Sequence, residues 1–127
     1  MVDGEGLPIR LLITPGQASD KTAAPRLLGD LSPGVVVADR GYDSMAIVEF
    51  VRARGGEPYI PTQRRVRIQR SVPAELYRRR NLVERYFCRL KQFRRIATRF
   101  DKHAANFLAA VALASARIWL AAIESTP

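Results

Sequence analysis

The stretch VVVADRGYDS, residues 35–44, decides the fold that we expect for this chain. Its first four residues form a short apolar run rich in β-branched side chains, which is typical of a buried strand. Asp39 follows at the carboxyl end of that strand, where open α/β sheets collect their ligand-binding groups. Asp43 or Ser44 can then cap a helix. A strand, a polar tip and a capped helix in succession predict an α/β fold.

The segments on both sides extend this pattern. Residues 7–14 are mostly apolar and predict a strand, after which Ser19 or Asp20 can cap a helix. After residue 44, apolar side chains at helical spacing predict a helix that closes at a glycine pair. The PYIP run at residues 58–61 predicts a short strand, whose prolines argue against a central position. The first helix runs through Leu27 and Leu28, and the second carries Ile47, Val48 and Val51 and ends at Gly55 and Gly56.

The C-terminal half is expected to be mostly helical. Residues 62–70 are basic, lack a period and predict a loop. Ser71 and Pro73 then predict the start of a long helix, and residues 106–123 predict an apolar final helix that covers the core or a partner. The apolar face of the long helix consists of Leu82, Val83, Tyr86, Leu90, Phe93 and Ile96.

A polar stripe runs along another side of the long helix. Tyr77, Arg80, Glu84 and Lys91 lie at offsets 0, 3, 7 and 14. At about 100° per residue they fall within roughly a 60° arc. A single carboxylate flanked by fixed cations indicates that a polyanion, or a metal ion bridging to one, binds there. Glu84 paired with Arg80 on an ordinary helix surface is the plainer alternative.

The charge of the chain is concentrated in one segment. The 127 residues are 47% hydrophobic, as expected of one small globular domain, and carry a net charge of +9. Residues 64–99 contain 13 Arg or Lys against two acids, a net of +11, so the other residues sum to −2. Because most of these cations are arginines, they suit bidentate contact with phosphate.

Cysteine usage and hydropathy indicate a cytoplasmic protein with no membrane partner. Cys88 is the only cysteine, so no disulfide can form within the chain, and we expect it to be buried as a small apolar residue. The apolar stretch 107–116 ends at Arg117 and is too short to span a bilayer. No signal peptide is apparent at Met1.

Asp39 and Glu84 are the candidate metal ligands. A pair of carboxylates binds hard divalent cations, and Mg²⁺ prefers carboxylate oxygens, waters and substrate phosphate. Two such ions roughly 4 Å apart can activate a water and stabilise the leaving oxygen in phosphodiester cleavage. Arg80 and Lys91 can each take a DNA phosphate, while Tyr77 stacks or hydrogen-bonds near a strand end.

Three segments together resemble the C-terminal two-thirds of the catalytic domain of bacterial insertion-sequence transposases of the DDE class. They are GLPIRLLITPGQASD at residues 6–20, VVVADRGYDS at residues 35–44, and Tyr-x2-Arg-x3-Glu-x6-Lys at residues 77–91. The resemblance implies a ribonuclease-H-like fold, in which three acids coordinate Mg²⁺ or Mn²⁺ to cut and rejoin DNA. It makes Asp39 the second acid and Glu84 the third.

The same resemblance implies the accessory residues and the partners. Tyr77, Arg80 and Lys91 match the accessory positions of the family's helix motif, and Lys91 is the one associated with terminal DNA. From their charge alone, Arg64 and Arg65 in the basic loop are further candidates for DNA contact, and a solvated loop is the open alternative. The implied partners are double-stranded DNA, at the element ends and at the target, and either intact transposase or a second copy of the chain. The implied location is the bacterial cytoplasm, at the nucleoid.

The chain departs from the family at its beginning. The family's first acid lies on the first strand, before the residues that match here. Asp3 is not expected to replace it, because the Asp3-Gly4 pair is typical of a turn. The N-terminal DNA-binding region is absent as well. We therefore expect residues 1–127 to be a truncated ribonuclease-H-like fold, with a small mixed sheet, flanking helices, a long basic helix and an apolar C-terminal helix. As a lone chain it is expected to be inactive in strand cleavage.

Two other function classes remain open at this point. A noncatalytic DNA-binding regulator, or a remnant of the element, would bind DNA with a steep salt dependence yet show no Mg²⁺-dependent nicking. A basic RNA-binding protein would place stacking aromatics among its cations, whereas Tyr86, Phe87 and Phe93 fall largely on the apolar side. His103 is expected near a helix start, and Phe107 and Trp119 in a core or interface.

Overall fold

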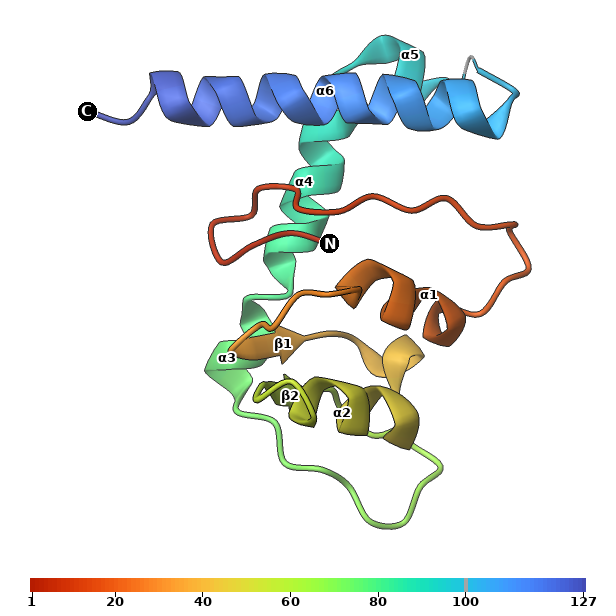
Figure 1. The fold of residues 1–127 in the computed structure, drawn as a ribbon, viewed down its shortest axis with the longest axis vertical. Helices are drawn as coiled ribbons and strands as arrows, with labels where there is room; N and C mark the ends of the chain where they lie inside the picture. The colour runs from red at the N-terminus through yellow and green to blue at the C-terminus, as the bar shows by residue number, and fades with distance from the viewer. Residues whose placement is uncertain (100) are drawn as a thin grey trace. The chain divides into compact units, whose positions relative to one another are not determined.

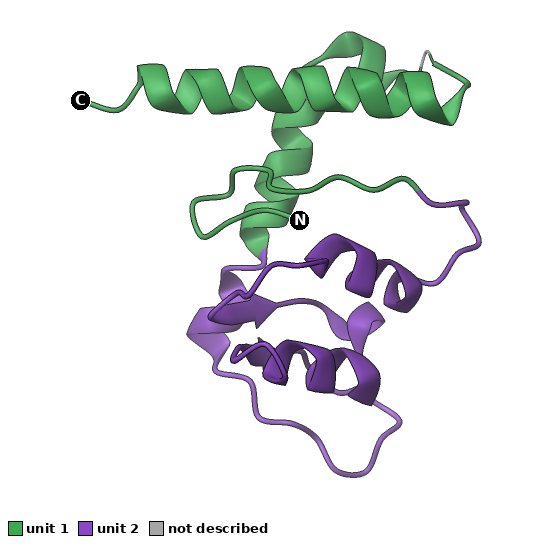
Figure 2. Cartoon of the chain, viewed as in Figure 1, with its two compact units in different colours: residues 1–13, 81–127 green, residues 14–80 purple. Residues whose placement is uncertain are grey.

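The computed structural model describes residues 1–99 and 101–127, which divide into two compact units (Figures 1 and 2). Unit 2 is Thr14–Arg80, and unit 1 combines Met1–Ile13 with Asn81–Pro127. Composition predicted one core, but each unit has its own cluster of buried apolar side chains. The architecture is α/β, as predicted, with helices outnumbering strands among the described residues.

Unit 2 contains a strand–helix–strand motif and three further helical segments, one of them a short 3-10 helix. β1 (Val35–Val37) and β2 (Glu57–Tyr59) pair in parallel. α2 (Met45–Arg52) connects them and packs on β2, as parallel strands require a crossover rather than a tight turn. α1 (Asp20–Leu28) packs on α2 and on the short 3-10 helix η1 (Arg40–Tyr42). The two predicted helices and the two strands around residues 35–61 are thus confirmed.

Local signals in the sequence explain these boundaries. Ser19 caps α1 and accepts a hydrogen bond from the N–H of Lys21 at 3.4 Å, while Ser44 is the N-cap residue of α2. The stripe on α2 is buried as predicted, and Val51 has no exposed surface. Gly56 precedes β2, and a Cβ there would lie 2.4 Å from the carbonyl oxygen of Pro33. Only glycine fits at that approach.

The sheet is smaller and more exposed than the sequence predicted. We expected a buried strand at residues 35–38 and a small mixed sheet, but the described strands form one parallel pair, and Val35 is 52% exposed. In a sheet of two strands both are edge strands, so neither is enclosed by neighbours. An edge position also tolerates Pro58 within β2.

Unit 1 is helical and has its own core. α4 (Asn81–Lys91), α5 (Arg94–Ala97) and α6 (Ala104–Glu124) contact one another. The buried cluster consists of Leu7, Tyr86, Leu90, Val111, Ala114 and Ile118. Two hydrogen bonds of 2.7 Å supplement it, one between the Tyr86 and Ser115 hydroxyls and one from the Trp119 indole N–H to the carbonyl oxygen of Pro8. The predicted core positions of Tyr86, Leu90, Phe93, Ile96 and Phe107 and the place of His103 before α6 are confirmed, whereas Leu82 and Val83 of the expected apolar face lie outside this cluster.

Two predicted elements are wrong. Residues 7–14 form no strand: among the described residues they make a single antiparallel bridge, between Val2 and Pro8. The long helix is broken into α3 (Ala74–Arg78) and α4. Between the two helices, the N–H groups of Arg79 and Arg80 bond to carbonyls three residues back, as in a tightened final turn.

One prediction about a single residue is also wrong. Cys88 is exposed, because it lies on the side of α4 opposite Tyr86 and Leu90, which carry the core contacts. α6 has the length and composition of a membrane-crossing helix, a test that the core helix of a soluble protein also passes. Four of its residues are buried in the unit 1 core instead: Val111, Ala114, Ser115 and Ile118.

Candidate functional site

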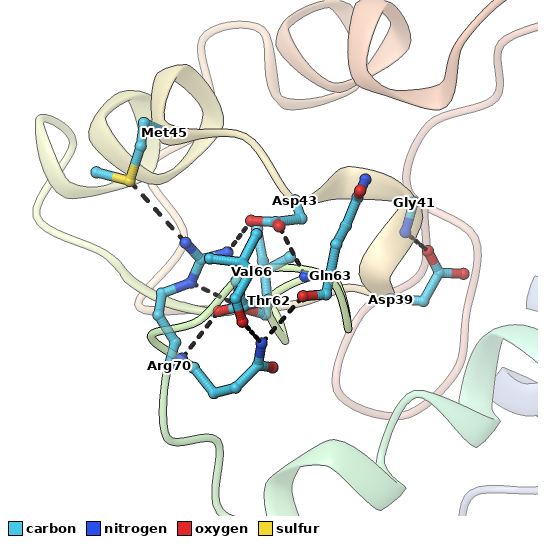
Figure 3. Close-up of polar contacts among 10 residues, drawn as sticks. Asp39, Gly41, Asp43, Met45, Thr62, Gln63, Val66 and Arg70 are labelled. Carbon is cyan, nitrogen blue, oxygen red and sulfur yellow. Dashed lines mark hydrogen bonds and ion pairs between the residues drawn. The ribbon is translucent and has the colours of Figure 1, made fainter.

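The carboxyl end of β1 carries the first candidate acid. Asp39 is the N-cap residue of η1, and its Oδ1 accepts a hydrogen bond of 2.8 Å from the N–H of Gly41 (Figure 3). Its Oδ2 lies 3.9 Å from the guanidinium Nη1 of Arg80, and the Asp39 side chain is 45% exposed. One oxygen is therefore fixed by the backbone, while the other faces a cation and solvent. The strand-end position expected for Asp39 is confirmed.

A second carboxylate lies beside Asp39 that sequence reasoning treated only as a helix cap. A Cβ placed on Gly41 would lie 2.9 Å from Asp39 Oδ1 and 3.2 Å from Asp20 Oδ2. Two acidic oxygens from α1 and η1 therefore converge on one point. Burial raises the pKa of Tyr42, and the charges of Asp20 and Asp39 raise it further. The only signal in the sequence was an acid in the first turn of α1, and the contact between α1 and η1 is what brings it here.

The titration of Tyr42 should report this pair of carboxylates. Asp39→Asn and Asp20→Asn should each lower the pKa of Tyr42 toward its ordinary value, since each removes a negative charge that opposes the phenolate. The Tyr42 ring carbon can be followed by NMR as a function of pH. Glu49→Gln, on the exposed side of α2, removes an equal charge and should leave the titration unchanged. An unshifted titration in both Asp variants would contradict the arrangement.

Asp43, which the sequence indicated as a cap of α2, instead anchors the basic loop. Its carboxylate pairs with the guanidinium of Arg70, and its Oδ2 accepts a hydrogen bond of 2.8 Å from the N–H of Gln63 (Figure 3). Burial alone would raise the pKa of Asp43, but the hydrogen bonds from Gln63 and Arg70, with the charges of Arg70 and Lys21, hold it below its usual range. The Asp43 side chain is 12% exposed.

Arg70 ties both ends of the loop together. Its Nε donates to the carbonyl oxygen of Ile60 at 3.1 Å, and its backbone N–H donates to the Thr62 hydroxyl at 2.8 Å. The side chain of Gln69 donates to the carbonyl oxygens of Gln63 and Val66 inside the loop. Residues 62–70 are thus a loop, as predicted, but one with a defined set of internal hydrogen bonds. We call this set, with Asp43, the loop anchor.

The remaining arginines of the loop point to solvent. Arg64, Arg65 and Arg67 are exposed, and within the part of the chain that the structure describes no ion pair or hydrogen bond involves their side chains. Arg70, Arg80 and Arg95, by contrast, each face a carboxylate. The basic loop, which the loop anchor holds in place, therefore carries three guanidinium groups that no carboxylate compensates, each with five N–H donors available to a polyanion.

The expected polar stripe is divided by the helix break. Tyr77 lies on α3, and Arg80 lies after it with its guanidinium carbon 5.7 Å from the Tyr77 ring centre, close to Asp39. Unit 2 thus gathers Asp39, Tyr77 and Arg80. Glu84 and Lys91 are exposed on α4, in unit 1. The prediction of a single helical face that carries all four side chains is therefore wrong. The pairing of Asp39 with Glu84 stays a prediction.

The donors near Asp39 suit a hard divalent cation. Carboxylate oxygens are the ligands that Mg²⁺ and Mn²⁺ prefer. Because the residue beside the Asp20 and Asp39 carboxylates is Gly41, no side chain at that position blocks their oxygens. Within residues 1–99 and 101–127, no group of three His, Cys, Asp or Glu side chains is arranged to hold a metal ion. Asp39 therefore fits the role of a ligand, with the Asp20 carboxylate beside it.

Comparisons with known proteins agree on one family. A family described as "Transposase DDE domain" matches residues 1–119. A protein of Brucella ovis, described as a transposase for insertion sequence element IS6501, is 37% identical over 125 residues, which cover 94% of each chain. A Burkholderia cepacia protein described as a transposase for element IS402 is 31% identical over 116 residues, 82% of this chain and 53% of that protein. No solved structure matches the chain.

Proposed function

The chain belongs to the transposase DDE domain family, and from this premise we propose that residues 1–127 are the C-terminal part of an insertion-sequence transposase catalytic domain. The observation that carries the proposal is the position of Asp39 after a parallel strand, with one carboxylate oxygen fixed by Gly41 and the other facing Arg80. A strand end in an α/β unit is where such folds bind ligands. We extend the proposal to a ribonuclease-H-like topology for the complete domain.

Asp39 and Glu84 would hold Mg²⁺ or Mn²⁺ in that domain, with Asp20 beside Asp39. When bound, the metal supplies Lewis acidity that activates water and stabilises the leaving oxygen of a phosphodiester. Arg80 balances the charge of Asp39 in the absence of a cation and would contact a DNA phosphate when a cation takes its place at Asp39. Lys91 and Tyr77 keep the roles that the family's helix motif implies, as contacts to the ends of the element.

The basic loop would bind the DNA backbone. Arg64, Arg65 and Arg67 are exposed without partners among the described residues, which favours phosphate contact over a network of surface ion pairs. This same observation favours a second function, that of a noncatalytic protein that occupies element ends. Both functions place the protein on DNA in the bacterial cytoplasm, and α6, with four residues in the unit 1 core, would not serve as a membrane span.

We further propose that the chain is catalytically incomplete by itself. The family uses three acids, and this sequence offers matching residues for two of them, Asp39 and Glu84. Purified chain with Mg²⁺ or Mn²⁺ and supercoiled DNA is therefore expected to give no more nicked product than a Glu84→Ala control. Strong nicking that either Asp39→Asn or Glu84→Ala abolishes would contradict incompleteness while supporting the assigned acids.

Metal binding can be tested without turnover. Mn²⁺ is expected to broaden the amide resonances of Asp39 and Gly41 selectively, because paramagnetic relaxation falls steeply with distance, and Mg²⁺ should reverse the broadening by competition. Asp39→Asn should abolish the effect. Glu49→Gln, which removes an exposed charge of the same sign from α2, should leave it intact. Broadening that persists in Asp39→Asn would remove Asp39 from the proposed metal site.

A further inference from the structure

The outward side of α6 carries an apolar stripe that the unit 1 core does not use. Its members are Ala109, Leu113, Ala116, Leu120 and Ile123, all exposed, and we call them the α6 stripe. Their spacings are four, three, four and three residues, which is the heptad spacing of a seam between paired helices. Leu113 is 75% exposed, Leu120 52% and Ile123 64%. Exposure of three large aliphatic side chains in one line indicates a binding surface.

The stripe is distinct from the face of α6 that packs inside the chain. Val111 and Ile118 are buried in the unit 1 core, two residues before Leu113 and Leu120 respectively. At about 100° per residue, each lies roughly 160° around the helix from its stripe neighbour. The helix therefore has two apolar faces on nearly opposite sides. One is covered by α4 and α5, and the other is open to a partner helix.

The charges on α6 select that partner. Arg117 and Glu124 are the only charged residues of Ala104–Glu124, so the helix is neutral while residues 64–99 carry +11. Two copies can therefore approach along α6 without bringing like charges together on it. Arg117 and Glu124 flank the stripe on one side, seven residues apart, and their Nη1 and Oε2 atoms lie 3.6 Å apart in the single chain.

We propose that the α6 stripe pairs in antiparallel orientation with the same stripe of a second copy of this chain. In this register Leu113 faces the partner subunit's Ile123. Ala116 faces the partner subunit's Leu120, so that in this second pair a small residue meets a large one. Side chains on a helix lean toward its N-terminus. In the same register, Arg117 and the partner subunit's Glu124 therefore lean toward each other. One alignment satisfies both the apolar seam and the only two charges.

A parallel pair does not achieve this. It would align Leu113 with the partner's Leu113, but Arg117 and Glu124 would then face uncharged flanks of the other helix. The charges would add nothing to association. The pair between Arg117 and the partner subunit's Glu124 thus specifies the orientation of the two helices. Because both side chains are exposed in the single chain, the pair contributes little to affinity.

The mass of the full chain in solution tests the proposal. Sedimentation equilibrium should show a species of about twice the 14.2 kDa chain mass. Leu113→Glu combined with Leu120→Glu should raise the dimer dissociation constant at least about tenfold, since charges then enter the seam. Ala105→Glu combined with Asn106→Glu adds the same charge at exposed positions of α6 that precede the stripe, and this matched control should keep the wild-type constant. A monomeric wild type, or equal loss of dimer in the control, would overturn the proposal.

Charge exchange tests the orientation. Arg117→Glu and Glu124→Arg should each weaken the dimer by roughly fivefold, and the double exchange should restore it. In a Cys88→Ser background, Ala116→Cys mixed with Leu120→Cys should give a heterologous disulfide, whereas a parallel pair would give disulfides between two copies of one variant. Homologous disulfides with no effect of charge exchange would overturn the antiparallel arrangement.

Discussion

Asp43→Ala should lower the free energy of unfolding of unit 2 by about 2–3 kcal/mol, because it leaves a partly buried guanidinium and a backbone N–H without their acceptor. The guanidinium is that of Arg70, and the N–H is that of Gln63. Urea denaturation followed through the methyl signals of Ile47 and Val51 would measure the unfolding of unit 2 by itself. Glu49→Ala removes the same charge from an exposed position and should change this free energy by less than about 0.5 kcal/mol.

The companion variant separates the ion pair from its surroundings. Arg70→Met alone should also destabilise unit 2, since it removes the donors to Asp43 and to the carbonyl oxygen of Ile60. In the double variant Asp43→Ala with Arg70→Met, the loss should be smaller than the sum of the two single losses, because neither charge is left unpaired. Additive losses would show that the two side chains act independently.

The pH dependence follows from the direction of the pKa shift. The pKa of Asp43 is held below its usual range in the folded chain, so its contribution is present above the unfolded value and is lost as pH falls through the folded value. The stability gap between wild type and Asp43→Asn should therefore be constant near neutral pH and close in acid, below about pH 4. A gap that widens in acid would contradict the ion pair.

Much of unit 2 could be predicted because its signals are local. Ser19 and Ser44 mark helix starts, the apolar stripe on α2 marks the buried face, and Val35–Val37 marks a strand. Each depends on side chains within a few residues of the element. The position of Asp39 followed from the same logic, since the end of a strand is defined by the strand itself.

The failures concern features that depend on distant residues. Residues 7–14 have the composition of a strand, but strand formation needs a partner that composition does not reveal. The break before α4 falls at Arg79 and Arg80, within a run of good helix formers that gives no local sign of an interruption. The approach of Asp20 to Asp39 arises from packing of α1 on η1. Glu84 is a different case from these failures, because it belongs to unit 1 and its pairing with Asp39 in unit 2 remains a prediction.

The combined change of Arg64, Arg65 and Arg67 to alanine should weaken binding to duplex DNA by roughly 100-fold at about 50 mM salt, if each phosphate contact contributes on the order of 1 kcal/mol. The slope of log K against log salt should become shallower by about 2.7, which is 0.9 for each of three lost contacts. Fluorescence anisotropy of a labelled duplex over a salt series would measure both. Because these side chains are exposed and have no partners among the described residues, the stability of unit 2 should not change.

A charge-matched control distinguishes a binding loop from overall basicity. Arg26, Arg52 and Arg94 are also exposed, and changing all three to alanine lowers the net charge by the same amount. If DNA is attracted only by the field of the whole chain, both triple variants should lose affinity equally. If the loop anchor holds the three guanidinium groups of the loop in position for phosphates, the loop variant should lose far more DNA affinity than the control variant. Asp43→Ala should then reproduce part of that loss without removing any cation. Equal losses in the two triple variants would leave the loop with no special role in binding.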